Sequence, residues 1–303
     1  MTRRHPAYPV RPLLRPGVRV CRRSDGNLQV GLDPRLALVV PDTAEVRTLL
    51  DGLREGTPPP HPDLLPARVA RLCVDLLDRG LVVDGDDLLA ALGAAPDRRT
   101  RESVAALFAE AGMAAGPLLR ARARVPVTVS HDRAPRSARR CRELLTAAGV
   151  GEASADGTGP VLHVARTEVD RDLTDAWMRA DRPHLLLALG DGIVRVGPFV
   201  VPGATACLRC LDAHHGDRDA RRSLVLHQYA AARVPRVGVP DPVPHDLLDL
   251  ALVWAVRDLL AWIDGRRPRS WSATVQVDPA LELARTPWPA HPGCGCAWGR
   301  LAG

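Results

Sequence analysis

The sequence predicts a two-part α/β protein, in which a small winged-helix-like module precedes a larger domain built on a mainly parallel sheet. Short strands and two amphipathic helices occupy residues 17–84, whereas apolar strands alternate with helices from residue 125 onward. Two cysteine pairs, far apart in the sequence, further predict a site that ties the end of the chain to its middle. The 303 residues, 46% of them hydrophobic, are enough for two ordinary domains.

The predicted module occupies residues 17–84 and follows a flexible tail, residues 1–16. Turn residues separate its short strands, and apolar residues recur at helical spacing in its two helices. The predicted strands and helices are, in chain order, Val18–Arg23, Leu28–Leu32, Leu36–Val40, Thr43–Leu53, Pro66–Arg79 and Leu81–Val83.

The predicted second domain, residues 125–303, follows a helical connector at residues 85–124 that is interrupted near Pro96. Its alternation of strands and helices is typical of a sheet whose strands run mainly parallel. The predicted elements are Val125–Ser130, Arg136–Ala148, Val161–Ala165, Leu173–Ala180, His184–Leu189, Ile193–Val196, a mostly helical segment 207–233, the helix Asp246–Ile263, and a hairpin of Trp271–Val277 with Leu281–Arg285.

The helix predicted at Asp246–Ile263 is apolar almost all round. A helix with this pattern is either buried or part of a subunit interface. It is therefore the element through which we expect a homodimer, if the chain forms one.

Arginine supplies all of the basic side-chain charge. None of the 41 residues counted as Lys or Arg is lysine, and the formal net charge is +6. The arginines are scattered rather than clustered, so the charge is weak support for nucleic-acid binding, and we expect no nucleic-acid partner. Without lysine, the chain can form neither a Schiff base nor a lysine-containing phosphate loop.

No targeting or membrane-spanning segment is predicted. The basic, proline-rich N-terminus, Met1–Val18, lacks the apolar core of a signal peptide. The longest apolar run, Leu247–Val256, is interrupted by Asp249 and is too short to cross a bilayer. We therefore expect a cytoplasmic chain with no membrane partner. In that reducing compartment, paired cysteines favour a metal over disulfides.

Four of the seven cysteines form two short clusters, Cys207 with Cys210 and Cys294 with Cys296. A Cys-x-x-Cys turn presents two sulfurs on one side, and a second pair completes the four-thiolate set that Zn²⁺ takes in structural sites. Gly295 allows the tight turn of the second pair. The sequence thus predicts a closed structural zinc site. The alternative is that the four cysteines are free or joined by disulfides.

Other candidate groups have weaker signals. Cys73 lies on the apolar face of a predicted helix and is expected in the core. His214, His215 and His291 flank the cysteine pairs and are expected to support the site or lie at the surface rather than ligate metal. Asp212 and its acidic neighbours are expected to be solvated helix charges.

The first strand-to-helix turn of the second domain lacks a phosphate-binding fingerprint. Residues 131–137 contain a proline and an acidic residue but no glycine. A glycine at this turn would let the backbone approach a phosphate. No clear second strand ends in an acidic residue for a ribose. We therefore do not expect this chain to bind ATP.

The segments Gly197–His214 and His291–Trp298, which carry both cysteine pairs, resemble the ThiF-like partner proteins of azole-forming peptide cyclodehydratases. These leader-peptide-binding proteins act in the biosynthesis of thiazole/oxazole-modified microcins and related bacteriocins. The resemblance is strong for residues 182–215 and 288–298, moderate for the N-terminal module and weak for residues 85–180.

This resemblance implies both a fold and a function. The N-terminal module is similar to a PqqD-like recognition element, which binds the leader of a ribosomally made precursor peptide. The second domain is similar to the ubiquitin-activating (ThiF) fold, a Rossmann-like fold that in this family usually lacks adenylating activity. It docks a separate YcaO protein that uses ATP to cyclise Cys, Ser or Thr side chains. The chain would then be a non-catalytic component of a cyclodehydratase complex.

The predicted strand Leu36–Val40 offers an edge beside the helix Pro66–Arg79. An extended leader could add to that edge through main-chain hydrogen bonds, while side chains supply specificity. The expected contacts are Leu36, Leu38 and Val40 on the strand, and Arg68, Arg71 and Asp75 on the exposed helix face. The alternative for the three charged residues is that they are simply solvated.

Two other functions are compatible with the sequence. A ThiF-type enzyme would adenylate the C-terminus of a peptide or carrier protein, but the turn without glycine argues against it. A winged-helix DNA-binding regulator would need a basic recognition helix, whereas the helix Pro66–Arg79 mixes Arg with Asp.

Overall fold

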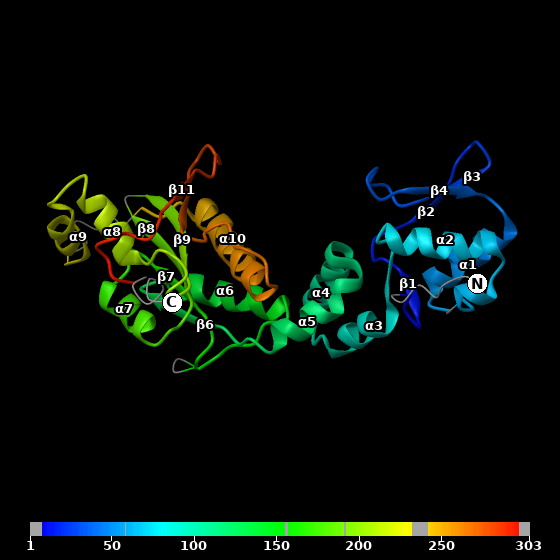
Figure 1. Cartoon of the computed structure of the whole chain (residues 1–303), viewed down its shortest axis with the longest axis horizontal. Helices are drawn as coiled ribbons and strands as arrows, with labels where there is room; N and C mark the ends of the chain where they lie inside the picture. The colour runs from blue at the N-terminus through cyan, green and yellow to red at the C-terminus, as the bar shows by residue number, and fades with distance from the viewer. Residues whose placement is uncertain (1–7, 58, 155–156, 191, 232–241, 297–303) are drawn as a thin grey trace. The chain divides into compact units, whose positions relative to one another are not determined.

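The computed structural model describes the chain except for residues 1–7, 58, 155–156, 191, 232–241 and 297–303 (Figure 1). The chain divides into two compact units, Met1–Arg120 and Ala121–Gly303.

A three-stranded antiparallel sheet and two helices form the first core of the N-terminal unit. The strand order is β2-β3-β4, and one buried apolar cluster joins the sheet to both helices. The Thr43 hydroxyl accepts a hydrogen bond from the Val46 amide to cap the first helix, which ends at Gly56 with a left-handed φ of 80°. The elements are β2 (Val20–Arg22), β3 (Asn27–Val30), β4 (Leu38–Pro41), α1 (Ala44–Glu55), the 3₁₀ turn η1 (Pro62–Leu64) and α2 (Ala67–Asp78).

A separate two-stranded sheet joins the start of this unit to its middle. Strand β1 (Pro12–Leu14) pairs antiparallel with β5 (Val82–Asp84), which places Leu13 opposite Val83. The expectation of a flexible tail through residue 16 is wrong for β1, because Leu13 and Leu14 are buried. A three-residue apolar run carries too little periodicity to be recognised as a strand.

Helices that follow β5 build a second small core in this unit. The side chains of Val104, Leu107 and Phe108 are buried against Leu13 and Val83. The segment expected to act as a connector therefore contributes a packed layer of its own. Its elements are α3 (Gly85–Ala94), α4 (Arg98–Ala111), the 3₁₀ turn η2 (Gly112–Ala114) and α5 (Ala115–Ala123).

The helical stretch Arg98–Ala123 is long and apolar enough to pass a test for a membrane span, with a mean hydropathy of 1.2. One such stretch is weak support for a span, because core helices pass the same test. Val104, Leu107 and Phe108 of this stretch are buried in the core described above.

A six-stranded mixed sheet forms the centre of the C-terminal unit, with the strand order β11-β10-β9-β8-β7-β6. Helices pack on both of its faces, so the unit is Rossmann-like and the prediction of an α/β class is confirmed. The strands are β6 (Thr128–Asp132), β7 (Val161–Ala165), β8 (His184–Gly190), β9 (Ile193–Val200), β10 (Ala273–Val277) and β11 (Arg285–Pro287); the helices are α6 (Pro135–Ala147), α7 (Arg171–Arg179), α8 (Leu208–Gly216), α9 (Arg222–Ala231) and α10 (His245–Ile263).

Two features of this sheet differ from the sequence prediction. Among the described strands of this sheet, only β6, β7 and β8 run parallel, because the two-residue connection between Gly190 and Ile193 is too short for a parallel crossover to β9. The last strand begins at Arg285 rather than Leu281, since Leu281 and Leu283 have left-handed φ values of 57° and 51°. A mixed sheet therefore replaces the mainly parallel one.

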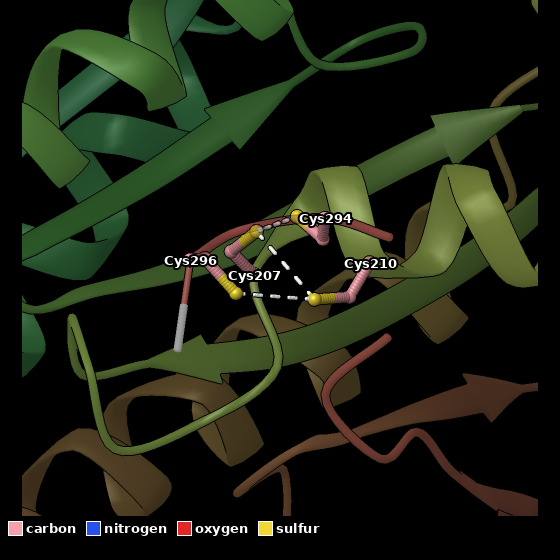
Figure 2. Close-up of side chains that lie close together, drawn as sticks. All are labelled: Cys207, Cys210, Cys294 and Cys296. Atoms are coloured by element: carbon pink, nitrogen blue, oxygen red, sulfur yellow. Dashed lines mark hydrogen bonds between the residues drawn. The ribbon is translucent and has the colours of Figure 1, made fainter. Parts of the chain in front are cut away.

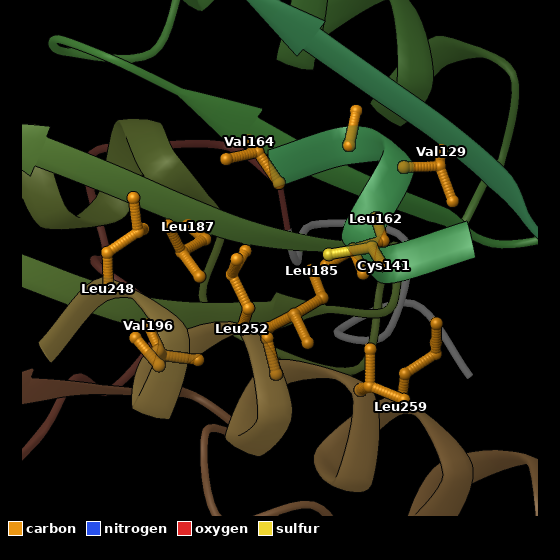
Figure 3. Packing of buried hydrophobic residues seen from close by; sticks show 14 of the residues in the cluster. Val129, Cys141, Leu162, Val164, Leu185, Leu187, Val196, Leu248, Leu252 and Leu259 are labelled. Atoms are coloured by element: carbon orange, nitrogen blue, oxygen red, sulfur yellow. The ribbon is translucent and has the colours of Figure 1, made fainter. Parts of the chain in front are cut away.

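Two apolar clusters cover the two faces of the sheet. One lies between the sheet and the helices α6 and α10, as the side chains in Figure 3 show. The other lies between the opposite face and the helices α7 and α8, and it includes Cys207, Cys210 and Trp288. Helix α10 is buried along one side, but Leu250 and Val253 are exposed. The homodimer stays a prediction.

Candidate functional site

The four paired cysteines meet at one end of α8, although more than eighty residues separate the pairs. Cys207 directly precedes α8, Cys210 lies in its first turn, and Cys294 and Cys296 follow β11. The Cys207 sulfur lies 3.8 Å from that of Cys210 and 3.5 Å from that of Cys294, and the sulfurs of Cys210 and Cys296 are 3.2 Å apart (Figure 2). The sequence prediction that these cysteines come together is confirmed.

This arrangement fits a metal ion better than disulfides. An ion about 2.3 Å from four tetrahedral sulfurs separates them by about 3.8 Å, whereas a disulfide needs about 2.05 Å. All four cysteines are free, and their sulfurs lie within 4.8 Å of one another. Cys207 and Cys210 are buried, and Cys294 and Cys296 are partly buried. The four cysteines could therefore hold a metal ion.

The ionisation of the sulfurs supports the same conclusion. The Cys207 thiol donates a hydrogen bond to Cys210, which is the main reason that the pKa of Cys210 falls to about 4. The hydrogen bond to Cys210 raises the pKa of Cys207, and burial raises that of Cys296 to about 12. The hydrogen bond between Cys207 and Cys210 thus places the negative charge of this pair on Cys210, and a cation would be needed to stabilise four thiolates together.

Histidine hydrogen bonds hold the second cysteine pair against α8. The backbone N–H of His291 donates to the Cys210 sulfur over 3.3 Å, and its Nε2 lies 3.0 Å from the Asp217 carboxylate. Its Nδ1 accepts from the Gly293 amide over 3.1 Å, so Nε2 carries the proton in the neutral ring. His214, Asp217 and His291 lie close enough to surround an ion. However, the hydrogen bonds of His291 favour a positioning role over ligation.

Trp288 packs the returning chain onto α8. Its ring lies against those of His214 and His215, with centroid distances of 6.0 and 4.9 Å, and its Nε1–H donates to the Thr274 hydroxyl over 2.9 Å. A buried aromatic ring and the cysteine site therefore fix the same segment. This role of Trp288 could not be predicted from the sequence, because a single tryptophan carries no spacing signal.

A larger polar cavity opens where the parallel strands end. Its volume is about 830 Å³, and it is lined by residues that follow β6 and β7 and by residues of α8 and α9. The turn after β6 has no glycine, and Arg133 in that turn adopts a left-handed φ of 49° and donates to the Thr167 hydroxyl over 3.0 Å. Five carboxylates and four guanidinium groups line this cavity, so its charge does not favour the phosphates of a nucleotide.

A network of partly buried ion pairs includes residues that line this cavity. Glu168 lies 3.1 Å from Arg171 and 2.8 Å from Arg195, and Arg171 also pairs with Asp212 over 2.8 Å. Burial opposes the charged form of Glu168, but the two guanidinium groups outweigh it and lower the pKa of Glu168. Sequence analysis took Asp212 for a solvated charge. That interpretation is wrong, because Asp212 is partly buried in the network.

The predicted peptide-binding residues lie on α2 and around β4. The side chains of Leu36, Leu38 and Val40 pack with the core cluster of the N-terminal unit, while Val39 is 47% exposed. Val40 is buried, whereas Leu36 and Leu38 are partly exposed, and their contact with a peptide stays a prediction. The helix residues Arg68, Arg71 and Asp75 are exposed, as expected.

The N-terminal unit also contains a cavity that was not predicted from the sequence. An apolar cavity of about 520 Å³ lies between α1, the start of α2 and the segment that joins them. Thr48, Leu49, Leu65 and Val69 contribute to its walls. The proline-rich connection had suggested only a break between helices, and its packing depends on contacts that spacing does not reveal.

Comparison with known proteins relates the fold to two solved enzymes. The structure of the heterocyclase TruD matches 95% of this chain with a TM-score of 0.62 and 17% identity, but the match spans 43% of TruD. Escherichia coli MccB, solved with MccA, matches 95% of this chain and 99% of its own with a TM-score of 0.57 and 13% identity. MccB solved with ATP gives a TM-score of 0.55 and 11% identity. These likenesses establish a shared fold.

The likeness to these solved proteins is one of structure. No family model matches the chain, and no curated protein matches it in sequence. The chain spans less than half the length of TruD.

Proposed function

We propose that this chain is the leader-peptide-binding partner of a YcaO-type, ATP-dependent cyclodehydratase, and that it presents a ribosomally made precursor peptide for azoline formation. The observation that carries the proposal is the open outer edge of β4. Among the described residues, β4 pairs only with β3, and the Arg79 guanidinium donates to the Ala37 carbonyl over 3.2 Å at the start of this edge. An extended peptide can add as a fourth strand beside α2.

The relation to TruD supports a division of labour. This chain accounts for 43% of the heterocyclase TruD, so more than half of TruD has no counterpart in it. We propose that the cyclising activity belongs to a YcaO-type protein. In this proposal the N-terminal unit is a winged-helix recognition element, and the C-terminal unit docks the YcaO-type protein.

The side chains that select the leader would lie on α2 rather than on β4. Val40 is buried, and Leu36 and Leu38 are partly buried, so β4 would offer mainly its main chain and the exposed Val39. Arg71 and Asp75 stand on the exposed face of α2. Main-chain bonds would give affinity, and these charges would give specificity for a leader of mixed charge.

We further propose that the cysteine site holds a structural Zn²⁺. The sulfur separations and the four-thiolate donor set are those of closed zinc sites. A site filled by four protein ligands leaves no position for a substrate, so the ion would stabilise the fold and take no part in cyclisation.

Adenylation is the second candidate, because MccB was solved with ATP and its whole length matches this chain. Two features of this chain argue against that activity. The turn after β6 has no glycine, and carboxylates outnumber guanidinium groups around the adjoining cavity. Pyrophosphate exchange with candidate peptides distinguishes the two functions, and we expect no exchange.

Fluorescence polarisation with a labelled precursor peptide, encoded near this chain, tests the leader-binding proposal. Charge reversal at Arg71 or Asp75 is expected to weaken binding about three- to tenfold without changing the melting temperature. Arg54→Glu, an exposed charge on α1, is the matched control and is expected to bind normally. Failure of the full chain to bind any such precursor, with or without a YcaO protein, would exclude the function.

A further inference from the structure

Among the described residues of the C-terminal unit, no carboxylate forms an ion pair with Arg222, at the start of α9. Arg222 lines the large polar cavity and two smaller cavities that adjoin it. Its Nε is buried without a hydrogen-bond partner among the residues that the structure describes. A buried donor without a partner costs about 1–3 kcal/mol, so a ligand that accepts from it would be stabilised.

The neighbouring carboxylates cannot neutralise this guanidinium without leaving other partners. Glu168 lines all three cavities, but Arg171 and Arg195 already occupy both of its oxygens. Asp212 accepts two hydrogen bonds from Arg171, of 3.0 and 2.8 Å. Arg222 is therefore the guanidinium group that this network leaves without a carboxylate partner.

One of the smaller cavities, of about 240 Å³, combines this charge with an apolar wall. Two guanidinium groups, of Arg195 and Arg222, and a single carboxylate line it, so one positive charge is in excess. Its apolar wall comes from Ile193, Val225 and Leu226. Its volume is roughly that of eight water molecules, which suits a group of a few carbon atoms.

The charges around Arg222 favour a carboxylate over a phosphate. One excess positive charge balances one negative charge, and a guanidinium fork matches the two oxygens of a carboxylate. The adjoining large cavity holds more carboxylates than guanidinium groups and would repel a multiply charged phosphate.

We propose that Arg222 anchors a carboxylate whose short apolar group fills the cavity beside Ile193, Val225 and Leu226. The ligand is either a small aliphatic acid or the C-terminal residue of a peptide, which share this chemistry. The site lies entirely in the C-terminal unit. It goes beyond the proposed leader binding and does not depend on it.

Ligand-observed NMR on the full chain, with saturation transfer and titration, tests this proposal. The probes are N-acetyl-leucine, hexanoate, uncharged N-acetyl-leucinamide and inorganic phosphate. Either acid is expected to bind saturably in the millimolar range, and the amide and phosphate at least tenfold more weakly. Tighter binding of N-acetyl-leucine would identify a peptide terminus as the source of the carboxylate, and tighter binding of hexanoate would identify a small acid.

Arg222→Met is expected to weaken binding of the acids at least tenfold, and Arg222→Lys to retain part of it. Arg221→Met removes the same charge one position earlier, outside all three cavities, and is expected to bind as the unaltered chain does. Equal melting temperatures establish that the variants fold. Absence of acid binding, equal binding of acid and amide, tighter binding of phosphate, or full binding by Arg222→Met would each overturn the proposal. Leader binding in the polarisation assay is unaffected by any of these outcomes.

Discussion

The cysteine site and the outer edge of β4 differ in how far their polar groups are enclosed and paired by other parts of the chain. At the cysteine site, two distant segments enclose four sulfurs, and hydrogen bonds from His291 together with packing by Trp288 hold the segments in place. At β4, the main chain of one edge has no strand beside it among the described residues. A closed site stabilises its own fold, whereas an open edge is completed by a partner.

The largest expected effect is at the closed site. Cys207→Ser or Cys294→Ser should leave the C-terminal unit poorly folded, because structural zinc contributes roughly 10–16 kcal/mol in small peptides, as much as the whole stability of a domain. Metal analysis and circular dichroism of the purified chain measure this loss. Cys21→Ser, at an exposed cysteine outside the site, is the control. A Cys207→Ser chain that melts normally would contradict the structural role.

A smaller loss is expected from the buried ion pair of Arg122 and Asp264, which are 4% and 0% exposed and 2.7 Å apart. Arg122→Met should destabilise the chain by about 3–5 kcal/mol in urea, because it leaves a buried carboxylate with less compensation. Arg98→Met breaks an exposed pair with Glu102 and should cost less than about 1 kcal/mol. Equal losses of stability in the two variants would show that burial does not determine how much an ion pair contributes to the stability of this chain.

Acid should weaken the C-terminal unit through two buried histidines. Burial lowers the pKa of His163 and of His184 to about 4, from an ordinary value of 6.5. Between pH 6.5 and 4 the unfolded chain binds protons that the folded chain does not. Stability should therefore fall with decreasing pH by up to about 1.4 kcal/mol per unit for each histidine, and these histidines add no such dependence above pH 6.5.

Urea unfolding at several pH values measures this slope, and His163→Gln should reduce it. His245→Gln, which replaces an exposed histidine at the start of α10, is the matched control. An unchanged slope in His163→Gln would rule out that histidine as a source of the acid sensitivity.

Local patterns in the sequence predicted most helices, because their apolar residues recur at 3.6-residue spacing. The bounds predicted for α2 and α10 lie within one residue of those in the structure. Contacts between distant residues were harder to predict. Nothing in Pro12–Leu14 indicates that it pairs with Val82–Asp84, and alternating strands and helices do not show where a sheet turns antiparallel.

The same distinction applies to the sites. The cysteines were predicted because their spacing is itself the signal of a metal site. The network of Glu168, Arg171, Arg195 and Asp212 was not, because it joins four segments and each residue alone looks like a solvated charge. The direction of Leu38 and Val40 into the core also depends on how β4 packs on its neighbours.

Hydrogen–deuterium exchange of the full chain, with and without the precursor peptide, tests the central claim most directly. We expect the peptide to slow exchange at β4 and along α2, and to leave α8 and the segment of residues 288–296 unchanged. This result would place peptide binding at the open edge and a structural role at the cysteine site. Protection around Cys207 and Cys294, with none at β4, would contradict the account.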